Sequence, residues 1–438
     1  MVYLFFTVLI LVLVAYFLND RELVAPSFLF SLSFFLASFF ALINDKKWNI
    51  QLGWITYQII SFGIIEFILV CYIVKMIFKY FLIKRKYNNE IIMETVGETN
   101  INNSNFRFKL FIIEFLELIF IFIIAKSIKN VTGQTDIVQA INLYNSSTNG
   151  FNDLTFTLPT YVKLMQTFIS AFGIFEQYIF VRDIIYNKRF EFLLFLGAMI
   201  GVLAPTLNGS RGGTIFGLIT FIVFLYIVQE EKNGWNNKNN KKYILIGLLV
   251  TVILILLLQW SATLVGRNVD SINFEDYIST YIGAEIKNLD IFVKKGIYPI
   301  KGTVFGQQTF YTTIQFFMKH GNLNIPLYHL DLPYTVSNGY GLGNVYTTFY
   351  PWLYDFGYKG VVILTLIMAF CSELIYEISK TSYKRKVSIF RLFYGGTIAP
   401  CIVFSFFSNK FYESLDIIYI TISIIIWIIA NYFFKELR

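Results

Sequence analysis

The chain has 438 residues, of which 56% are hydrophobic and only 15% are charged, and its mean hydropathy is +0.60. Soluble globular proteins contain about 25% charged residues, so this composition excludes an ordinary soluble protein of this length. The formal net charge of +8 does not indicate nucleic-acid binding, because the cations lie in short loops between apolar runs, which is the pattern that orients membrane helices. We therefore expect a membrane protein with no nucleic-acid partner.

The apolar runs are about 17 to 25 residues long, and a helix needs ~20 residues to cross the ~30 Å hydrocarbon core of a bilayer. Because lipid offers no partner to backbone N–H and C=O groups, such runs are expected to be helical. We predict an all-α integral membrane protein with about eleven transmembrane helices, in a range of about ten to twelve. The predicted helices cover residues 2–18, 24–43, 53–78, 109–127, 158–181, 191–207, 213–229, 243–264, 358–379, 392–408 and 414–434.

The first apolar run has no basic segment before it and no Ala-x-Ala pattern after it, so we expect a retained helix rather than a removable signal.

Lysine and arginine gather in five stretches, namely 79–108, 182–190, 230–242, 380–391 and 435–438. The predicted helices place all five on one side, and the positive-inside rule makes that side the cytoplasm. We therefore expect the N-terminus outside and the C-terminus in the cytoplasm. Lys46 and Lys47 fall on the outer side in this arrangement.

The predicted helices divide the chain into three consecutive parts, residues 1–264, 265–357 and 358–438. The first part contains helices one to eight and a cytoplasmic linker at 79–108. The second is a large outer loop between the eighth and ninth helices, and the third contains the last three helices. Residues 128–157 and the short turn 208–213 lie on the same outer side. Apolar residues at helical spacing within 274–292 predict an amphipathic helix near the membrane interface.

The turn at 208–213 places an arginine, Arg211, between Gly209-Ser210 and Gly212. Glycines let a ligand approach the backbone, the next helix begins with free N–H groups, and arginine offers a bidentate fork for phosphate. The turn is therefore a candidate cradle for phosphate or pyrophosphate. The alternative is a tight turn in which Arg211 reaches lipid headgroups.

Several polar residues elsewhere allow more than one interpretation. Arg267 is either an interfacial anchor beside Trp260 or a second cation facing the same anionic ligand. His320 and His329, the two histidines of the chain, are candidates for a general acid or base near neutral pH, or are solvated loop residues. The carboxylates of the outer segment are candidates for binding sugar hydroxyls or for base catalysis, and their spacing selects none of them: Glu275, Asp276, Glu285, Asp290, Asp331 and Asp355.

Ionisable or amide side chains also interrupt the apolar runs, at Glu66, Glu114, Glu117, Glu176, Gln177 and Glu373. Such groups are costly in a bilayer, so they are either functional or pair between helices.

The three cysteines, Cys71, Cys371 and Cys401, lie inside apolar runs without the spacing of a metal site or a disulfide framework. The sequence also lacks a Walker A loop and a His-Glu-x-x-His motif. We expect no metal and no cofactor.

Two stretches suggest a family. The block GNVYTTFYPWLYDFGYKG, from Gly343 to Gly360, leads directly into the predicted ninth helix. It resembles a segment of the bacterial oligosaccharide repeat-unit polymerases, the Wzy-type O-antigen and capsule polymerases. The Ser210-Arg211-Gly212 turn resembles the other marker of that family. The layout, with a short basic turn and then a large outer loop late in the chain, is similar along nearly the whole topology.

The resemblance implies a GT-C-like, lipid-dependent glycosyltransferase in the bacterial cytoplasmic membrane. Such an enzyme joins repeat units carried on undecaprenyl pyrophosphate at the outer face, and makes O-antigen, capsule or a related surface polysaccharide. The implied partners are the lipid-linked donor and acceptor and membrane lipid, with flippase and chain-length regulator proteins as further candidates. Two alternatives stay open, an O-antigen ligase-like transferase and a flippase or other transporter of lipid-linked glycan. No internal repeat is visible, which disfavours a transporter.

This chemistry needs groups that stabilise charge on the leaving pyrophosphate and that position an acceptor hydroxyl. We expect Arg211, with Arg267 as its partner, to contact the pyrophosphate. His320, His329 and Asp355 are candidates for the base, and none of them is matched to a catalytic histidine of the family. The aromatic segments 310–317 and 346–354 are candidates for stacking on sugars. The candidate substrate-binding residues are Gly209, Ser210, Gly212, Asn344, Tyr346, Tyr350 and Tyr354.

Overall fold

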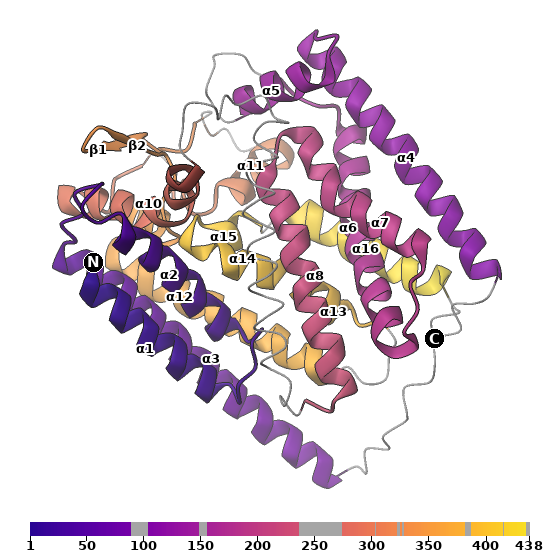
Figure 1. The fold of residues 1–438 in the computed structure, drawn as a ribbon, viewed down its shortest axis with the longest axis horizontal. Helices are drawn as coiled ribbons and strands as arrows, with labels where there is room; N and C mark the ends of the chain where they lie inside the picture. Colours follow the sequence, from indigo (N-terminus) through magenta and orange to yellow (C-terminus); the bar gives the residue numbers. More distant parts are fainter. Residues whose placement is uncertain are drawn as a thin grey trace. The chain divides into compact units, whose positions relative to one another are not determined.

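The computed structural model describes residues 1–88, 104–148, 156–235, 274–302, 304–321, 325, 328–381, 387–414 and 416–434. The chain forms two compact units, and both are almost entirely helical (Figure 1). The first unit lies within residues 1–93, 274–381 and 397–417, and the second within 94–273, 382–396 and 418–438. The units therefore alternate along the sequence and differ from the three consecutive parts predicted above, because segments distant in the chain pack together in each.

The long helices of the first unit are α1 (Val2–Leu18), α2 (Pro26–Ile43), α3 (Trp54–Asn88) and α12 (Phe349–Thr381). The ring of Phe30 in α2 stacks on that of Phe67 in α3, with centroids 4.2 Å apart. Gly63 lets α12 approach α3, because a Cβ there would lie 2.5 Å from Cζ of Phe349. A break at Gly357, whose φ is +63°, divides α12 and requires a glycine.

The remaining elements of the first unit are α10 (Phe274–Lys295), α11 (Tyr311–His320), β1 (Thr335–Ser337), β2 (Tyr340–Gly343), α14 (Ala399–Val403), a 3-10 turn (Phe404–Phe406) and α15 (Lys410–Glu413). The predicted amphipathic helix at 274–292 is confirmed as α10, and it packs against α2, where Gly283 approaches the backbone of Ala41. The Asn338-Gly339 turn joins β1 to β2 with positive φ at both residues, as a two-residue hairpin turn requires.

Contacts within the first unit show which loops share an end of the helices. At one end, the loop after α2 meets α10, through an ion pair between Lys47 and Asp276 and a 2.8 Å hydrogen bond from Lys287 Nζ to the Asn49 carbonyl. At the other end, Glu22 pairs with Lys380 at 3.0 Å. In the first unit, the predicted cytoplasmic loops and the predicted outer segment thus lie at opposite ends of the helices. The charge of Lys47 is offset by that of Asp276.

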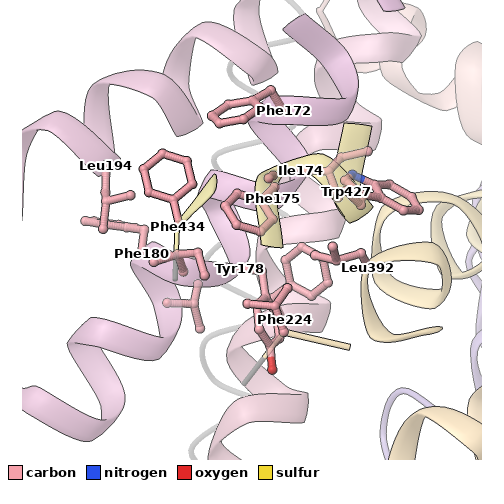
Figure 2. Packing of buried hydrophobic residues seen from close by; sticks show 14 of the residues in the cluster. Phe172, Ile174, Phe175, Tyr178, Phe180, Leu194, Phe224, Leu392, Trp427 and Phe434 are labelled. Atoms are coloured by element: carbon pink, nitrogen blue, oxygen red, sulfur yellow. The ribbon is translucent and has the colours of Figure 1, made fainter. Parts of the chain in front are cut away.

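The second unit contains α4 (Ser104–Thr132), α5 (Ile137–Thr148), α6 (Thr160–Arg182), a π turn (Asp183–Asn187), α7 (Phe192–Leu203), a 3-10 turn (Ala204–Asn208), α8 (Arg211–Lys232), α13 (Ile389–Phe393), a π turn (Tyr394–Ile398) that ends in the first unit, and α16 (Ile417–Phe433). Figure 2 shows its buried cluster, in which Tyr178 of α6 packs edge-on to Phe224 of α8 at 5.3 Å. Trp427 of α16 donates a 2.8 Å hydrogen bond to the Ala171 carbonyl. Glycines 173 and 201 bring α6 and α7 together, since a Cβ on Gly173 would lie 2.5 Å from the Gly201 Cα.

Most predicted helices are confirmed, although α3 ends ten residues later and α12 begins nine residues earlier than predicted, and the one at 243–264 lies outside the described residues. The helix predicted at 392–408 is confirmed as a continuous helical stretch at Ile389–Phe406. It is made of α13, a π turn, α14 and a 3-10 turn, and the π turn lies directly before Pro400, whose nitrogen cannot donate a helical hydrogen bond. The loop predicted at 128–157 is wrong in part, because α4 continues to Thr132 and α5 packs its Ala140 and Tyr144 into a buried cluster.

The linker predicted at 79–108 is helical at both of its ends. Helix α3 continues to Asn88 and α4 begins at Ser104, and residues 89–103 lie outside the described part. Lysine, arginine and isoleucine are compatible with a helix that continues past the apolar run. The polar composition at these ends therefore marks the edge of the bilayer-spanning part rather than the end of the helix.

Six helices among the described residues are long and apolar enough to cross a membrane, and three shorter apolar helices accompany them. The six lie at Pro26–Ile43, Trp54–Phe81, Thr160–Asn187, Gly212–Lys232, Phe349–Lys380 and Ile389–Phe406. This result supports an all-α, multi-pass membrane protein. The number of crossings, about eleven, stays a prediction.

Candidate functional site

An exposed carboxylate, Asp331, lies against a group of three tyrosines in the first unit. The hydroxyl of Tyr350 donates a 2.6 Å hydrogen bond to the Asp331 backbone carbonyl. The hydroxyl of Tyr354 interacts with the Asp331 carboxylate, whose charge also reaches Tyr346. Gln308 Oε1 accepts the Asp331 N–H at 3.1 Å, so the backbone of Asp331 is held on both sides while its side chain stays exposed.

The spacing of the tyrosines explains how they come together. Tyr350 and Tyr354 lie four residues apart in the first turns of α12, on one face of the helix, and Tyr346 lies three residues before α12 begins. The rings of Tyr346 and Tyr350 stack with centroids 4.2 Å apart, and Phe292 of α10 packs edge-on to Tyr350 at 4.6 Å. All three tyrosines are buried, with exposed fractions of 5% or less.

Burial, and then the charge of Asp331, raises the pKa of Tyr346. Its hydroxyl therefore stays protonated and donates a 2.9 Å hydrogen bond to the Pro333 carbonyl. The tyrosines thus support the segment that contains Asp331. Direct contact of these tyrosines with a sugar stays a prediction.

Asp355, a candidate base in the sequence, binds backbone N–H groups in the structure. Its Oδ2 accepts the N–H of Gln308 at 3.1 Å and the N–H of Thr309 at 2.7 Å. The Thr309 hydroxyl donates to the Pro351 carbonyl at 3.1 Å, which attaches the same turn to α12. Asp355 is therefore a positioning residue for the turn whose Gln308 holds Asp331.

The two histidines have different surroundings. His329 is exposed and precedes Asp331 by two residues, so both side chains belong to one short segment. His320 is the last residue of α11, where its ring stacks on Phe316 at 5.0 Å and its Nδ1 lies 3.1 Å from the Phe316 carbonyl. Of the two histidines, His329 is therefore the one close to Asp331 in the chain.

Asn344, a predicted substrate-binding residue, is half-buried between β2 and α12.

The Ser-Arg-Gly turn lies in the second unit, at the start of α8. Gly209 has a φ of +70° and leaves no room for a Cβ, which would lie 2.6 Å from Asn145 Cβ in α5. Ser210 caps α8, and its Oγ accepts the Gly213 N–H at 3.2 Å. A Cβ on Gly212 would meet no described atom within 4 Å.

This geometry is compatible with the predicted anion cradle. The first N–H groups of a helix have no intrahelical partner, and here they are those of Arg211 and Gly212. Arg267, the predicted second cation, lies outside the described residues.

Sequence reasoning placed Asp331 among six outer carboxylates without selecting it. The tyrosines four residues apart were visible in the sequence, but the residue that their hydroxyls meet depends on how the chain between α11 and β1 folds back. Asp331 combines an exposed carboxylate with a fixed backbone and a nearby histidine. Carboxylate oxygens accept hydrogen bonds from sugar hydroxyls and can accept a proton from one of them.

Comparisons with protein-family models, with curated proteins and with solved structures found no match to this chain.

Proposed function

We propose that this chain is a polymerase that joins undecaprenyl-pyrophosphate-linked oligosaccharide repeat units at the outer face of the bacterial cytoplasmic membrane. The product would be O-antigen, capsule or a related surface polysaccharide. The observation that supports this proposal most is the Asp331 segment, which presents an exposed carboxylate and His329 at the end of the first unit opposite the Glu22–Lys380 pair. With the basic loops in the cytoplasm, that end faces outward.

The proposed reaction exchanges one bond to the anomeric carbon for another. The acceptor hydroxyl oxygen attacks the anomeric carbon of the donor glycan, the bond from that carbon to the pyrophosphate oxygen breaks, and undecaprenyl pyrophosphate leaves with the electron pair. Asp331 accepts the hydroxyl proton, and His329 is the alternative acceptor. The charge that develops on the pyrophosphate is offset by cationic side chains and N–H groups, and Arg211 stays the residue predicted from the sequence for this role.

The test uses chromosomal variants in the native host, with extracted surface glycan separated on a gel. A general base contributes roughly 10²–10⁴-fold to a rate. We therefore expect Asp331→Asn and Arg211→Ala to remove the ladder and to leave a single repeat unit on the acceptor. Asp276→Asn is the matched control, because it neutralises a carboxylate of the same unit that pairs with Lys47, and it should keep the ladder.

Membrane abundance of each variant must equal that of the wild type for the comparison to count. A normal ladder from both Asp331→Asn and Arg211→Ala would contradict the proposed site. Polymer that accumulates on lipid without reaching its final acceptor would identify a ligase instead. Repeat units that accumulate on the cytoplasmic leaflet would identify a flippase.

A further inference from the structure

Three carboxylates converge inside the second unit. Glu114 and Glu117 lie one turn apart in α4, and Glu176 comes from α6. One carboxylate oxygen from each lies within 4.8 Å of the others. The side chains are 2%, 0% and 0% exposed, in the same order.

All six oxygens of these carboxylates are buried, and none accepts a well-formed hydrogen bond, although Glu114 and Glu176 interact with one another and the Gly197 N–H lies near Glu114. Within the described part of the chain, no lysine or arginine forms an ion pair with any of the three. Buried polar groups in proteins are almost always hydrogen-bonded, and a buried charge is normally paired or bound to a metal. The charge of these buried oxygens is therefore offset either by shared protons or by a bound cation that contacts all three carboxylates.

Gly197 of α7 keeps the space beside the cluster open. A Cβ at this position would lie 2.0 Å from Oε2 of Glu176 and 2.5 Å from Oε1 of Glu114. No side chain larger than that of glycine fits without displacing both carboxylates. Helices α4, α6 and α7 pack against one another around this point. The close approach of α7 thus completes a compartment bounded by carboxylate oxygens.

We propose that Glu114, Glu117 and Glu176 bind a hard divalent metal cation, for which Ca²⁺ is the probe. Hard divalent cations take oxygen ligands, and Ca²⁺ binds six to eight of them at about 2.3–2.6 Å. The three oxygens lie within 4.8 Å of one another, so a single cation can contact all three. Three carboxylates also supply three negative charges, which a divalent ion offsets better than a monovalent one.

This site is separate from the proposed glycosyl transfer, because none of its residues belongs to the Asp331 segment or to the Ser-Arg-Gly turn. The expectation of no metal rested on the spacing of cysteines and histidines, and it did not consider carboxylates from different helices. A cation held between α4 and α6 would stabilise the second unit. Metal content and thermal stability therefore report on the site without any assay of activity.

The experiment uses the full chain in nanodiscs, dialysed against Ca²⁺ and then against metal-free buffer. Metal content is measured by mass spectrometry, and melting temperature is measured with and without EDTA. We expect about one Ca²⁺ per chain in the wild type and a lower melting temperature in EDTA. Glu117→Gln keeps the side-chain shape and should reduce the Ca²⁺ affinity at least about tenfold, as loss of a ligand charge predicts. Gly197→Ala should do the same by displacing Glu176 and Glu114.

Glu66→Gln is the matched control, since it neutralises a carboxylate in a membrane helix of the first unit and should leave Ca²⁺ binding unchanged. A wild-type chain without bound Ca²⁺ and without a response to EDTA would overturn the proposal, and would indicate that protons neutralise the cluster. Binding that persists in Glu117→Gln and Gly197→Ala would place the metal elsewhere and would also overturn it. Selective binding of Na⁺ would overturn the assignment to a divalent ion.

Discussion

The hydroxyl of Tyr350 donates a 2.6 Å hydrogen bond to the backbone carbonyl of Asp331, which lies 19 residues earlier in the chain. This bond holds the backbone of Asp331, whose carboxylate is exposed, against a buried turn of α12. Its position suggests that Tyr350 acts through Asp331 rather than by touching a substrate.

Tyr350→Phe tests that role, because it removes the hydroxyl and keeps the ring that stacks on Tyr346. The loss of one hydrogen bond costs about 0.5–1.5 kcal/mol, so we expect a small fall in melting temperature. Loosening of Asp331 should lower the rate of polymer formation in isolated membranes several-fold. Tyr298→Phe is the control, since its hydroxyl meets only that of Tyr358 among the described residues and should leave the rate unchanged. Equal rates in the wild type and Tyr350→Phe would separate this tyrosine from the function of Asp331.

The Asp355 carboxylate predicts a larger effect on stability. Asp355→Ala leaves the N–H groups of Gln308 and Thr309 without their acceptor, and each such loss costs about 1–3 kcal/mol in a partly buried site. We expect a clear fall in the melting temperature of the purified chain. Asp276→Ala breaks a partly exposed ion pair with Lys47, which is worth at most about 1 kcal/mol. If the two variants melted at the same temperature, the proposed positioning role of Asp355 would be wrong.

Glu285 of α10 predicts a dependence of stability on pH. Burial raises the pKa of its carboxyl group well above the ordinary value, so the folded chain keeps this group protonated where the unfolded chain has lost the proton. A folded pKa above the unfolded one means that stability falls as the pH rises from the unfolded pKa toward the folded one. Glu285→Gln keeps the neutral shape and removes this dependence. The melting temperature of the variant should therefore exceed that of the wild type by an increasing amount between about pH 5 and pH 8. Parallel melting curves across that range would contradict this assignment.

The sequence was sufficient to predict the long helices, because a run such as that of α2 has no other way to satisfy its backbone in lipid. It was not sufficient for α5, a short helix outside the long apolar runs that is stabilised by tertiary contacts at Ala140 and Tyr144. The same limit applies to the candidate sites. The spacing of Glu114 and Glu117 places them on one face of α4, but only the packing of α6 adds Glu176. Likewise, only the fold shows which carboxylate meets the tyrosines of α12.

Arg391 offers a test of how the second unit is held at the end that contains its basic loops. This side chain is fully buried, forms a 2.7 Å ion pair with Glu231, and donates a 3.1 Å hydrogen bond to the Tyr178 hydroxyl. Removal of one partner from a buried ion pair costs about 3–5 kcal/mol, because the other charge is left without compensation. Arg391→Met should therefore lower the melting temperature strongly.

The double variant Arg391→Met with Glu231→Leu removes both charges and keeps apolar volume, so it should recover most of the lost stability. A double-mutant cycle measured by thermal unfolding gives the coupling between the two residues directly. Recovery would mean that the pair provides specificity for the close contact of α13 with α6 and α8, rather than net stability. If the two single effects instead added without recovery, stability would depend on the other contacts of Arg391, which include the Tyr178 hydroxyl. Tyr178→Phe would then reproduce part of the loss of stability.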